Sequence, residues 1–344
     1  MPAAFVGHGN PMNALEVNRY TSAWTAFGQS IPRPRAILVV SAHWYINATV
    51  VTAMPWPRTI HDFYGFPPAL FAVQYPAPGL PELAAEISDV VQPTWVGSDA
   101  DSWGIDHGTW SVLVHAFPDA SVPVVQLSID ASKPLAYHLD LGAQLAPLRA
   151  RGVLIIASGN IVHNLAGMNW SMPELGFDWA QRFDQDAQHI MLTDPTELAT
   201  LDRHRDYRLA VPTPDHFIPA LYLAGLAGEA RAPRTDVLIE GCTYGSLSMT
   251  AYTLGLAGDE DAVGLRRTTP FEELIGRSEP SSSDVPIGTV EGPSAQSTPA
   301  ASSAAQPRAS QRGGHDAGLP VTVSGSMGSR ARPTLMWRTT PGPR

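Results

Sequence analysis

The sequence has few cysteines and few basic residues, and each shortage excludes classes of protein. Cys242 is the single cysteine among 344 residues. Disulfide frameworks and cysteine-based zinc sites are therefore excluded, and any metal would need His, Asp or Glu ligands. Residues 1–258 contain 13 of the 22 Lys and Arg residues but 23 of the 32 Asp and Glu residues. Such an acidic segment repels a phosphate backbone, and we expect no nucleic acid partner.

Signals for membrane insertion and secretion are also missing. No apolar run reaches the roughly 18 residues that a transmembrane helix needs. The N-terminal segment lacks the charged region and long apolar stretch of a secretory signal. We therefore expect a cytoplasmic protein with no membrane partner.

Two common catalytic motifs are absent. No Gly-x-Ser-x-Gly sequence occurs, which excludes the nucleophile elbow of α/β hydrolases. Gly7-His8-Gly9 begins like a dinucleotide-binding loop, but Met12 occupies the place of the third glycine, so that interpretation fails. Cys242 has no activating neighbours in the sequence, and we expect a buried free thiol.

The composition changes sharply near residue 259. Residues 280–344 are rich in Pro, Ser, Ala, Gly and Arg. Such a segment cannot bury enough apolar surface to offset its ordering entropy. We therefore expect a folded domain at 1–258 and a low-complexity, disordered tail at 259–344.

Residues 1–258 alternate between short apolar runs and helical patterns, which predicts an α/β fold. Strands that are buried on both faces appear as continuous apolar runs, so we expect a mostly parallel central sheet with helices on both faces. The predicted strands are 4–6, 36–41, 48–54, 122–128, 152–157, 235–240 and a segment within 246–254. The predicted helices are 14–28, 81–91, 110–117, 133–150, 177–192 and 216–226.

Four histidines stand where apolar runs stop. His8, His43 and His163 come just past three predicted strands, and His216 follows a Pro-x-Pro turn near a predicted helix start. Each one alone could be an ordinary polar residue at the end of a strand. Because the carboxyl ends of parallel strands share one edge of the sheet, however, these imidazoles should converge there. Neutral imidazole is the commonest metal ligand, so the sequence predicts a metal site at the strand carboxyl ends.

Polar and aromatic residues near these histidines suggest substrate contacts. Segments 61–67 and 103–110 combine aromatic rings with a few polar groups, which suits either a wall for a small planar ligand or ordinary loop packing. Asp215 either caps the following helix or orients an imidazole, and we favour the cap. The candidate substrate-binding residues are His107, Asp106, His61 and Trp44.

The chain resembles the class III extradiol ring-cleavage dioxygenases, and among them the 4,5-DOPA extradiol dioxygenase type. The resemblance extends from Phe5 to about Leu254. It rests on motifs that occur in family order, including Gly-His-Gly-Asn-Pro-Met, Val-Ser-Ala-His-Trp, Thr-Ile-His-Asp-Phe-Tyr-Gly-Phe-Pro, Trp-Gly-Ile-Asp-His-Gly-Thr-Trp, Ala-Ser-Gly-Asn-Ile-Val-His-Asn-Leu and Pro-Thr-Pro-Asp-His-Phe-Ile-Pro.

The resemblance implies a non-haem metal held by His8, His43 and His216. It also implies that His163 is the catalytic acid and base, and that His107 contacts the substrate. Most members of the wider class use two His and one carboxylate, whereas here His216 stands in the place of the carboxylate. Fe(II) would be needed for activity, and Zn(II) could occupy the same all-histidine shell with His163 as a fourth ligand.

The activity implied is the oxidative opening of a catechol ring, with L-DOPA-like substrates cleaved at the 4,5 position. Both atoms of O2 would enter a ring-opened semialdehyde, while His163 accepts a phenolic proton and later returns it. Two alternatives use the same histidines: a zinc hydrolase with three His and a bound water, and a metal-binding module without turnover. Dependence on O2 distinguishes the hydrolase, and the effect of His163→Ala distinguishes the module.

Overall fold

The computed structural model describes residues 1–229 and 235–256. The tail predicted at 259–344 lies outside these described residues. Within the described part of the chain, no helix is both long enough and apolar enough to cross a membrane.

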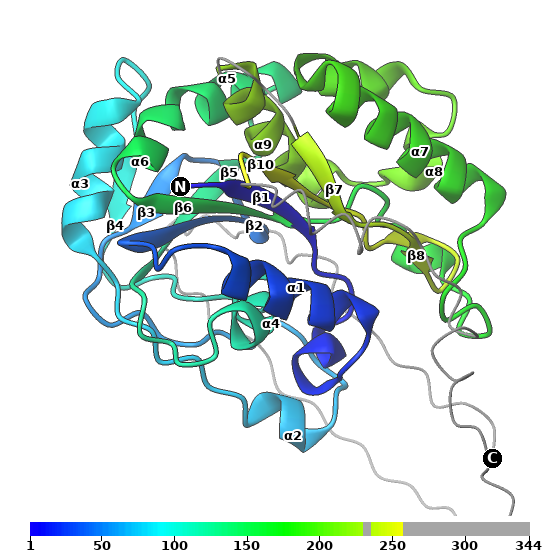
Figure 1. The fold of residues 1–344 in the computed structure, drawn as a ribbon, viewed down its shortest axis with the longest axis horizontal. Helices are drawn as coiled ribbons and strands as arrows, with labels where there is room; N and C mark the ends of the chain where they lie inside the picture. Colours follow the sequence, from blue (N-terminus) through cyan, green and yellow to red (C-terminus); the bar gives the residue numbers. More distant parts are fainter. Residues whose placement is uncertain (230–234, 257–344) are drawn as a thin grey trace, which may run out of the picture. The chain divides into compact units, whose positions relative to one another are not determined.

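An eight-stranded mixed sheet forms the centre of the fold (Figure 1). In order across the sheet its strands are β4 (Gly97–Asp99), β3 (Val50–Thr52), β5 (Val124–Asp130), β2 (Ala36–Ile46), β6 (Val153–Gly159), β1 (Ala3–Gly7), β10 (Ala251–Leu254) and β7 (Thr235–Ile239). The four inner strands, β5, β2, β6 and β1, are mutually parallel, whereas β3 and β10 pair antiparallel with them. A separate two-stranded ribbon joins β8 (Cys242–Thr243) to β9 (Leu247–Ser248).

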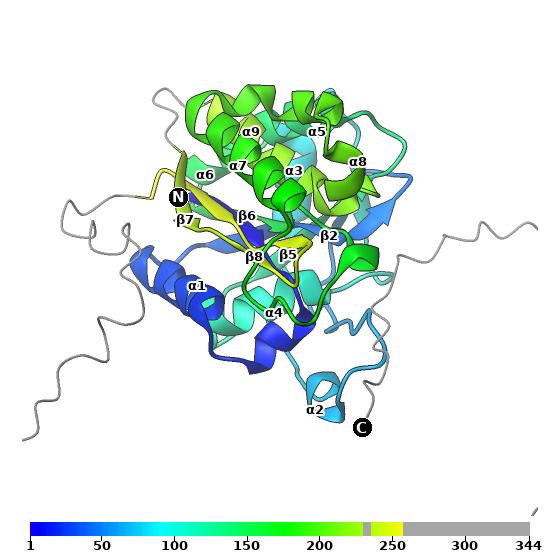
Figure 2. The ribbon, with the colours of Figure 1, turned by 90° about the vertical axis from the view of Figure 1, so that its right-hand side faces the viewer.

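Helices cover both faces of the sheet (Figures 1 and 2). One face packs against α3 (Pro81–Val90), α5 (Leu135–Gln144), α6 (Ala146–Ala150), α7 (Asp178–Thr193), α8 (Tyr207–Ala210), α9 (Ile218–Gly228) and the 3-10 helix η3 (Pro195–Arg203). The other face packs against α1 (Arg19–Ser30), α2 (Pro68–Phe71) and α4 (His107–Ala116). Shorter 3-10 helices are η1 (Pro11–Leu15), η2 (Leu165–Gly167) and η4 (Pro214–His216). The expected α/β fold is confirmed.

Local signals explain where helices depart from their predicted bounds. The first helix begins at Arg19 because Asn18 caps it, and the predicted start near residue 14 is the separate helix η1. The predicted helix 133–150 is two helices, since Pro147 has no N–H with which to continue α5. The strand predicted within 246–254 is divided between β9 and β10.

The expected strand-end position is correct for His8 and His163 and wrong for His43. His8 follows the last residue of β1, and His163 lies just beyond β6. His43 lies inside β2, which continues to residue 46, and the register of β2 against β5 shifts between Val40 and Tyr45. Because β2, β6 and β1 are neighbours in the sheet, all three histidines still meet at its carboxyl edge.

Candidate metal centre

Three imidazoles form a nearly equilateral triangle at this edge. The ring centroids of His8 and His43 are 5.0 Å apart, those of His8 and His216 5.3 Å, and those of His43 and His216 5.1 Å. Tetrahedral ligands with metal–nitrogen bonds of about 2.1 Å would hold their ring centroids about 5 Å apart. The triangle therefore has the dimensions of a three-histidine metal site.

The Nδ1 atom of His8 is hydrogen-bonded to a serine, which leaves its Nε2 atom to face the candidate metal centre. Ser158 Oγ donates a hydrogen bond to the Gly108 carbonyl at 2.5 Å, so it accepts from His8 Nδ1 at 3.0 Å. His8 therefore carries its proton on Nδ1 and presents the Nε2 lone pair, as a metal ligand must.

Carboxylates contact the Nδ1 atoms of His43 and His216, so these two rings also have Nε2 toward the centre. His43 Nδ1 is 2.9 Å from Asp62 Oδ2, and His216 Nδ1 is 2.5 Å from Asp215 Oδ2. Metal-binding histidines are usually held by such a bond from the ring nitrogen that faces away from the metal. The prediction that Asp215 caps the following helix is wrong, since its carboxylate is turned to the imidazole of the next residue and neither η4 nor α9 has a side-chain cap.

The space between the rings also fits a cation. The Nε2 atoms of His8 and His43 lie 3.1 Å apart, and two bare lone pairs at that distance repel unless a proton or a cation lies between them. Gly108 keeps this space open, because a Cβ there would be 2.7 Å from His43 Cδ2 and 3.3 Å from His8 Cε1. The donor set and its surroundings therefore fit a bound metal.

His163 is held differently from these three. Its ring stacks on His216 with centroids 3.5 Å apart and planes 4° from parallel. Its backbone N–H donates to the Ala210 carbonyl, and it forms an isolated bridge with Leu247. No ion pair joins His163 to a carboxylate within residues 1–229 and 235–256.

His107, the first residue of α4, completes the cluster. Its Nδ1 lies 2.8 Å from Asp62 Oδ1, and its buried Nε2 has no hydrogen-bond partner among the described residues. Its ring is 3.8 Å from that of His43. The possible ligand atoms of His8, His43 and His107 lie within 4.8 Å of one another, and those of His163, Asp215 and His216 form a second such group.

Burial and neighbouring charges set the protonation of the cluster. Burial and the surrounding imidazoles hold the pKa values of His8 and His163 well below the usual value. Burial opposes the charged form of His43 as well, but the attraction of Asp62 outweighs it and raises the pKa. In the metal-free chain His43 is thus the natural carrier of a proton, while its neighbours are neutral imidazoles able to bind a metal.

The remaining predicted substrate residues differ in what they contact. Both oxygens of Asp106 are occupied by internal donors, among them Ser41 and Gln126, so this buried carboxylate supports the N-terminus of α4. His61 bonds the Val73 carbonyl through Nε2. Trp44 stacks in parallel on Trp103 with ring centroids 5.6 Å apart.

Two residues that the site depends on, Asp62 and Ser158, have little signal in the amino-acid sequence. Asp62 lies in an irregular loop, and nothing in its local pattern indicates that it meets His43 and His107. Ser158 is the sixth residue of β6, where a small residue in an apolar strand is unremarkable. The sequence signal for Ser158 is a serine that precedes Gly-Asn at the end of a buried strand, next to the edge where the histidines were expected to meet.

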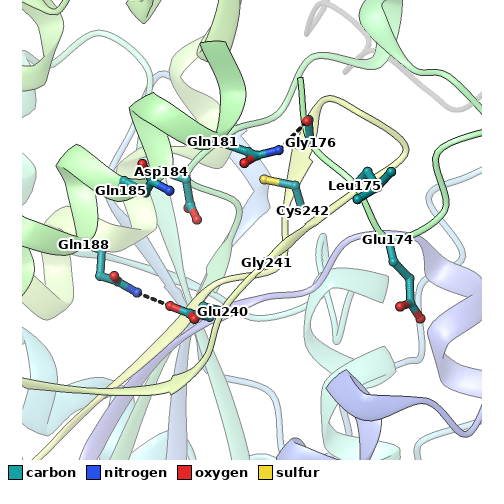
Figure 3. A pocket seen from close by; sticks show the side chains of 10 residues that line it. All are labelled: Glu174, Leu175, Gly176, Gln181, Asp184, Gln185, Gln188, Glu240, Gly241 and Cys242. Atoms are coloured by element: carbon teal, nitrogen blue, oxygen red, sulfur yellow. Dashed lines mark hydrogen bonds between the residues drawn. The ribbon is translucent and has the colours of Figure 1, made fainter. Parts of the chain in front are cut away.

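A separate cleft of about 230 Å³ lies between α7 and the segment before β8 (Figure 3). Its lining contains acids, amides and Cys242 but no histidine. Burial raises the pKa of the Cys242 thiol, as expected for a buried free cysteine. This cleft is not the candidate metal centre.

Comparison with known proteins agrees with the geometry. Residues 10–255 match the family model described as the catalytic LigB subunit of aromatic ring-opening dioxygenase. The chain is 46% identical over 259 residues to a 4,5-DOPA dioxygenase extradiol of Escherichia coli K12, covering 74% of this chain and 95% of that protein. A protein of the same name from Beta vulgaris is 36% identical over 234 residues, covering 65% and 86%.

A solved structure is similar as well. The crystal structure of an uncharacterized protein from Escherichia coli K12 aligns with a TM-score of 0.65 and 41% sequence identity. The alignment covers 74% of this chain and all of that chain.

Proposed function

This chain belongs to the family of the catalytic LigB subunit of aromatic ring-opening dioxygenases. It is an extradiol dioxygenase that cleaves a catechol ring, and we propose that its substrates are L-DOPA-like catechols opened at the 4,5 position. The names of its relatives from Escherichia coli and Beta vulgaris support this choice of substrate. Both atoms of O2 enter the ring-opened semialdehyde, so the reaction needs no further reductant.

The triangle of His8, His43 and His216 is the observation that carries this proposal. LigB dioxygenases use a non-haem metal, and these three rings would hold it through their Nε2 atoms. Bound Fe(II) would orient the catechol and O2 and pass electrons between them. Zn(II) fits the same imidazoles but has no redox chemistry, so we propose Fe(II) for activity.

His163 acts as the acid and base rather than as a ligand. Its centroid lies 3.5 Å from that of His216, much closer than the roughly 5 Å expected for two tetrahedral ligands of one ion. With no carboxylate paired to it, its ring is available to accept a phenolic proton and return it during ring opening.

His107 holds the substrate beside these groups. Its Nε2 is the buried polar atom of the cluster that lacks a partner in the described structure, and an oxygen of a bound catechol would satisfy it. The histidines are at most 9% exposed, so the site also keeps water away from the reacting groups.

Oxygen uptake tests the proposal. The enzyme is prepared metal-free, reconstituted anaerobically with Fe(II) or Zn(II), and mixed with L-DOPA or simple catechols while absorbance is scanned for a yellow ring-opened product. We expect iron-dependent O2 uptake with one O2 consumed per product formed. Absence of uptake with every catechol under Fe(II) would contradict the proposed function.

A further inference from the structure

Asp62 contacts two histidines of the cluster at once. Its Oδ2 lies 2.9 Å from His43 Nδ1, and its Oδ1 lies 2.8 Å from His107 Nδ1. The same Oδ1 also accepts the backbone N–H of His107 at 3.1 Å. The carboxylate therefore receives three hydrogen bonds, and both of its oxygens are used.

The loop that carries Asp62 is fixed on both sides. Ile60 N–H donates to the Ile105 carbonyl at 2.8 Å, and the Trp110 indole donates to the Ile60 carbonyl at 2.8 Å. The ring of Phe63 lies against His107, with centroids 5.3 Å apart. The segment before α4 and α4 itself thus hold the loop, so the carboxylate is a rigid part of the site.

We propose that Asp62 is a positioning residue that fixes the proton of both His43 and His107 on Nδ1. An ionised carboxylate only accepts hydrogen bonds, so each facing ring nitrogen must donate. The Nε2 atoms are then left bare, one as a metal ligand and the other toward the substrate. This inference rests on the proposed function, since it assigns those two tasks to His43 and His107.

The substitution Asp62→Asn tests the proposal because an amide cannot accept from both rings. Its oxygen accepts one bond, but its NH2 group donates, so one facing Nδ1 must become an acceptor. That ring then carries its proton on Nε2, toward the metal or substrate. We expect the dissociation constant for Co(II) or Zn(II) to rise about 10- to 100-fold, the usual effect of losing such a partner.

The readout is the position of the histidine protons in the zinc-loaded protein, by ¹⁵N NMR, together with metal titration. In the wild-type protein both rings should carry the proton on Nδ1, and in Asp62→Asn at least one should carry it on Nε2. A proton on Nε2 of either ring in the wild-type protein would overturn the proposal without any variant.

Asp184→Asn is the matched control. Asp184 is buried and, like Asp62, accepts one side-chain hydrogen bond on each oxygen, but from the hydroxyls of Ser248 and Thr250. It should change metal affinity by less than about threefold, since the 10- to 100-fold effect belongs to partners of ligands. An equal loss of affinity in both variants would reduce Asp62 to a structural role and overturn the proposal.

Asp62→Glu covers the case in which Asp62→Asn does not fold. Glutamate keeps two accepting oxygens, so both protons should stay on Nδ1 and the dissociation constant for Zn(II) should rise less than about 10-fold. A shift of either proton to Nε2 in Asp62→Glu would contradict the proposal. Failure of the proposed function is a separate result, because missing O2 uptake with catechols would leave these protons and the metal affinity unchanged.

Discussion

Two carboxylates in the fold have opposite electrostatics: Asp62 in the histidine cluster, whose side chain is 16% exposed, and the buried Asp184 in α7. Burial would raise the pKa of Asp62, but His107 and His43 lower it well below its usual value. Burial raises the pKa of Asp184 to about 6, and hydrogen bonds from Ser248 and Thr250 do not offset the rise. A carboxylate that is largely removed from water thus keeps its charge where its partners can carry positive charge, and neutral hydroxyls are not sufficient.

The difference follows what each carboxylate does. Asp62 must stay ionised to keep two imidazoles in one orientation, whereas Asp184 links α7 to the chain at β9. Asp184 also lines the cleft of Figure 3, near the acidic Glu240. One carboxylate therefore orients groups of the candidate metal centre, whereas the other stabilises the packing of α7.

Removal of a ligand should give the largest effect. In His216→Ala the triangle loses one imidazole, and we expect metal affinity to fall by more than about 100-fold, beyond the range for losing an outer partner. Competition with a chelator measures it, and His189→Ala, an exposed histidine of α7, is the control. Retention of affinity in His216→Ala would remove this residue from the ligand set.

Removal of the carboxylate of Asp215 should have a smaller effect than the corresponding change at Asp62. Asp215 contacts one imidazole, so in Asp215→Asn the amide oxygen can still accept the His216 Nδ1 proton. We expect metal affinity to fall about 10-fold, at the lower end of the usual range. Chelator competition compares the two Asn variants side by side, and a greater loss at Asp215 would contradict the tautomer argument.

The raised pKa of Asp184 should instead make the free energy of unfolding depend on pH. Its pKa rises from 3.8 to about 6 on folding, so between these values the folded protein holds a proton that the unfolded chain has lost. Stability is therefore lost as pH rises through this window, by up to about 3 kcal/mol. Urea unfolding of Asp184→Asn and wild type at pH 4 and pH 7 measures the difference. The free energy of unfolding of Asp184→Asn should increase relative to that of the wild type as pH rises. An equal difference between the two proteins at pH 4 and pH 7 would contradict the raised pKa.

The smallest effect is expected from the C-terminal region. We propose that the catalytic domain ends near residue 258, because the family match ends at residue 255. Truncation after residue 258 should leave the rate of ring opening within about twofold, since the family match and all the histidines of the candidate metal centre lie before that residue. Thermal unfolding and O2 uptake check it, and an unfolded product would contradict the assigned boundary.

The elements that sequence predicted well are those that burial dictates. β1, β5 and β6 are buried along their whole length and read as apolar runs. The convergence of His8 and His163 followed from their places past the ends of such runs, whereas His43 lies inside β2 and His216 in η4. β4 has only three residues and no apolar pattern, which is why the sequence did not indicate it.

The contacts that orient the histidines could not be predicted in the same way. Asp215 has the local pattern of a helix cap, and its contact with His216 depends on how the Pro-x-Pro turn packs. Asp62 reaches its two imidazoles from a loop far away in sequence. Local sequence patterns therefore indicated which histidines are candidate metal ligands, whereas the tertiary fold determines which carboxylates orient those histidines.

The substitution His163→Ala tests whether three histidines hold the metal while the fourth performs the proton transfers. Metal content and iron-dependent O2 uptake with a catechol are measured on the same sample. We expect full metal content with turnover lowered at least about 100-fold, the contribution typical of a positioned acid or base. Loss of the metal together with turnover, or turnover near that of the wild type, would contradict it.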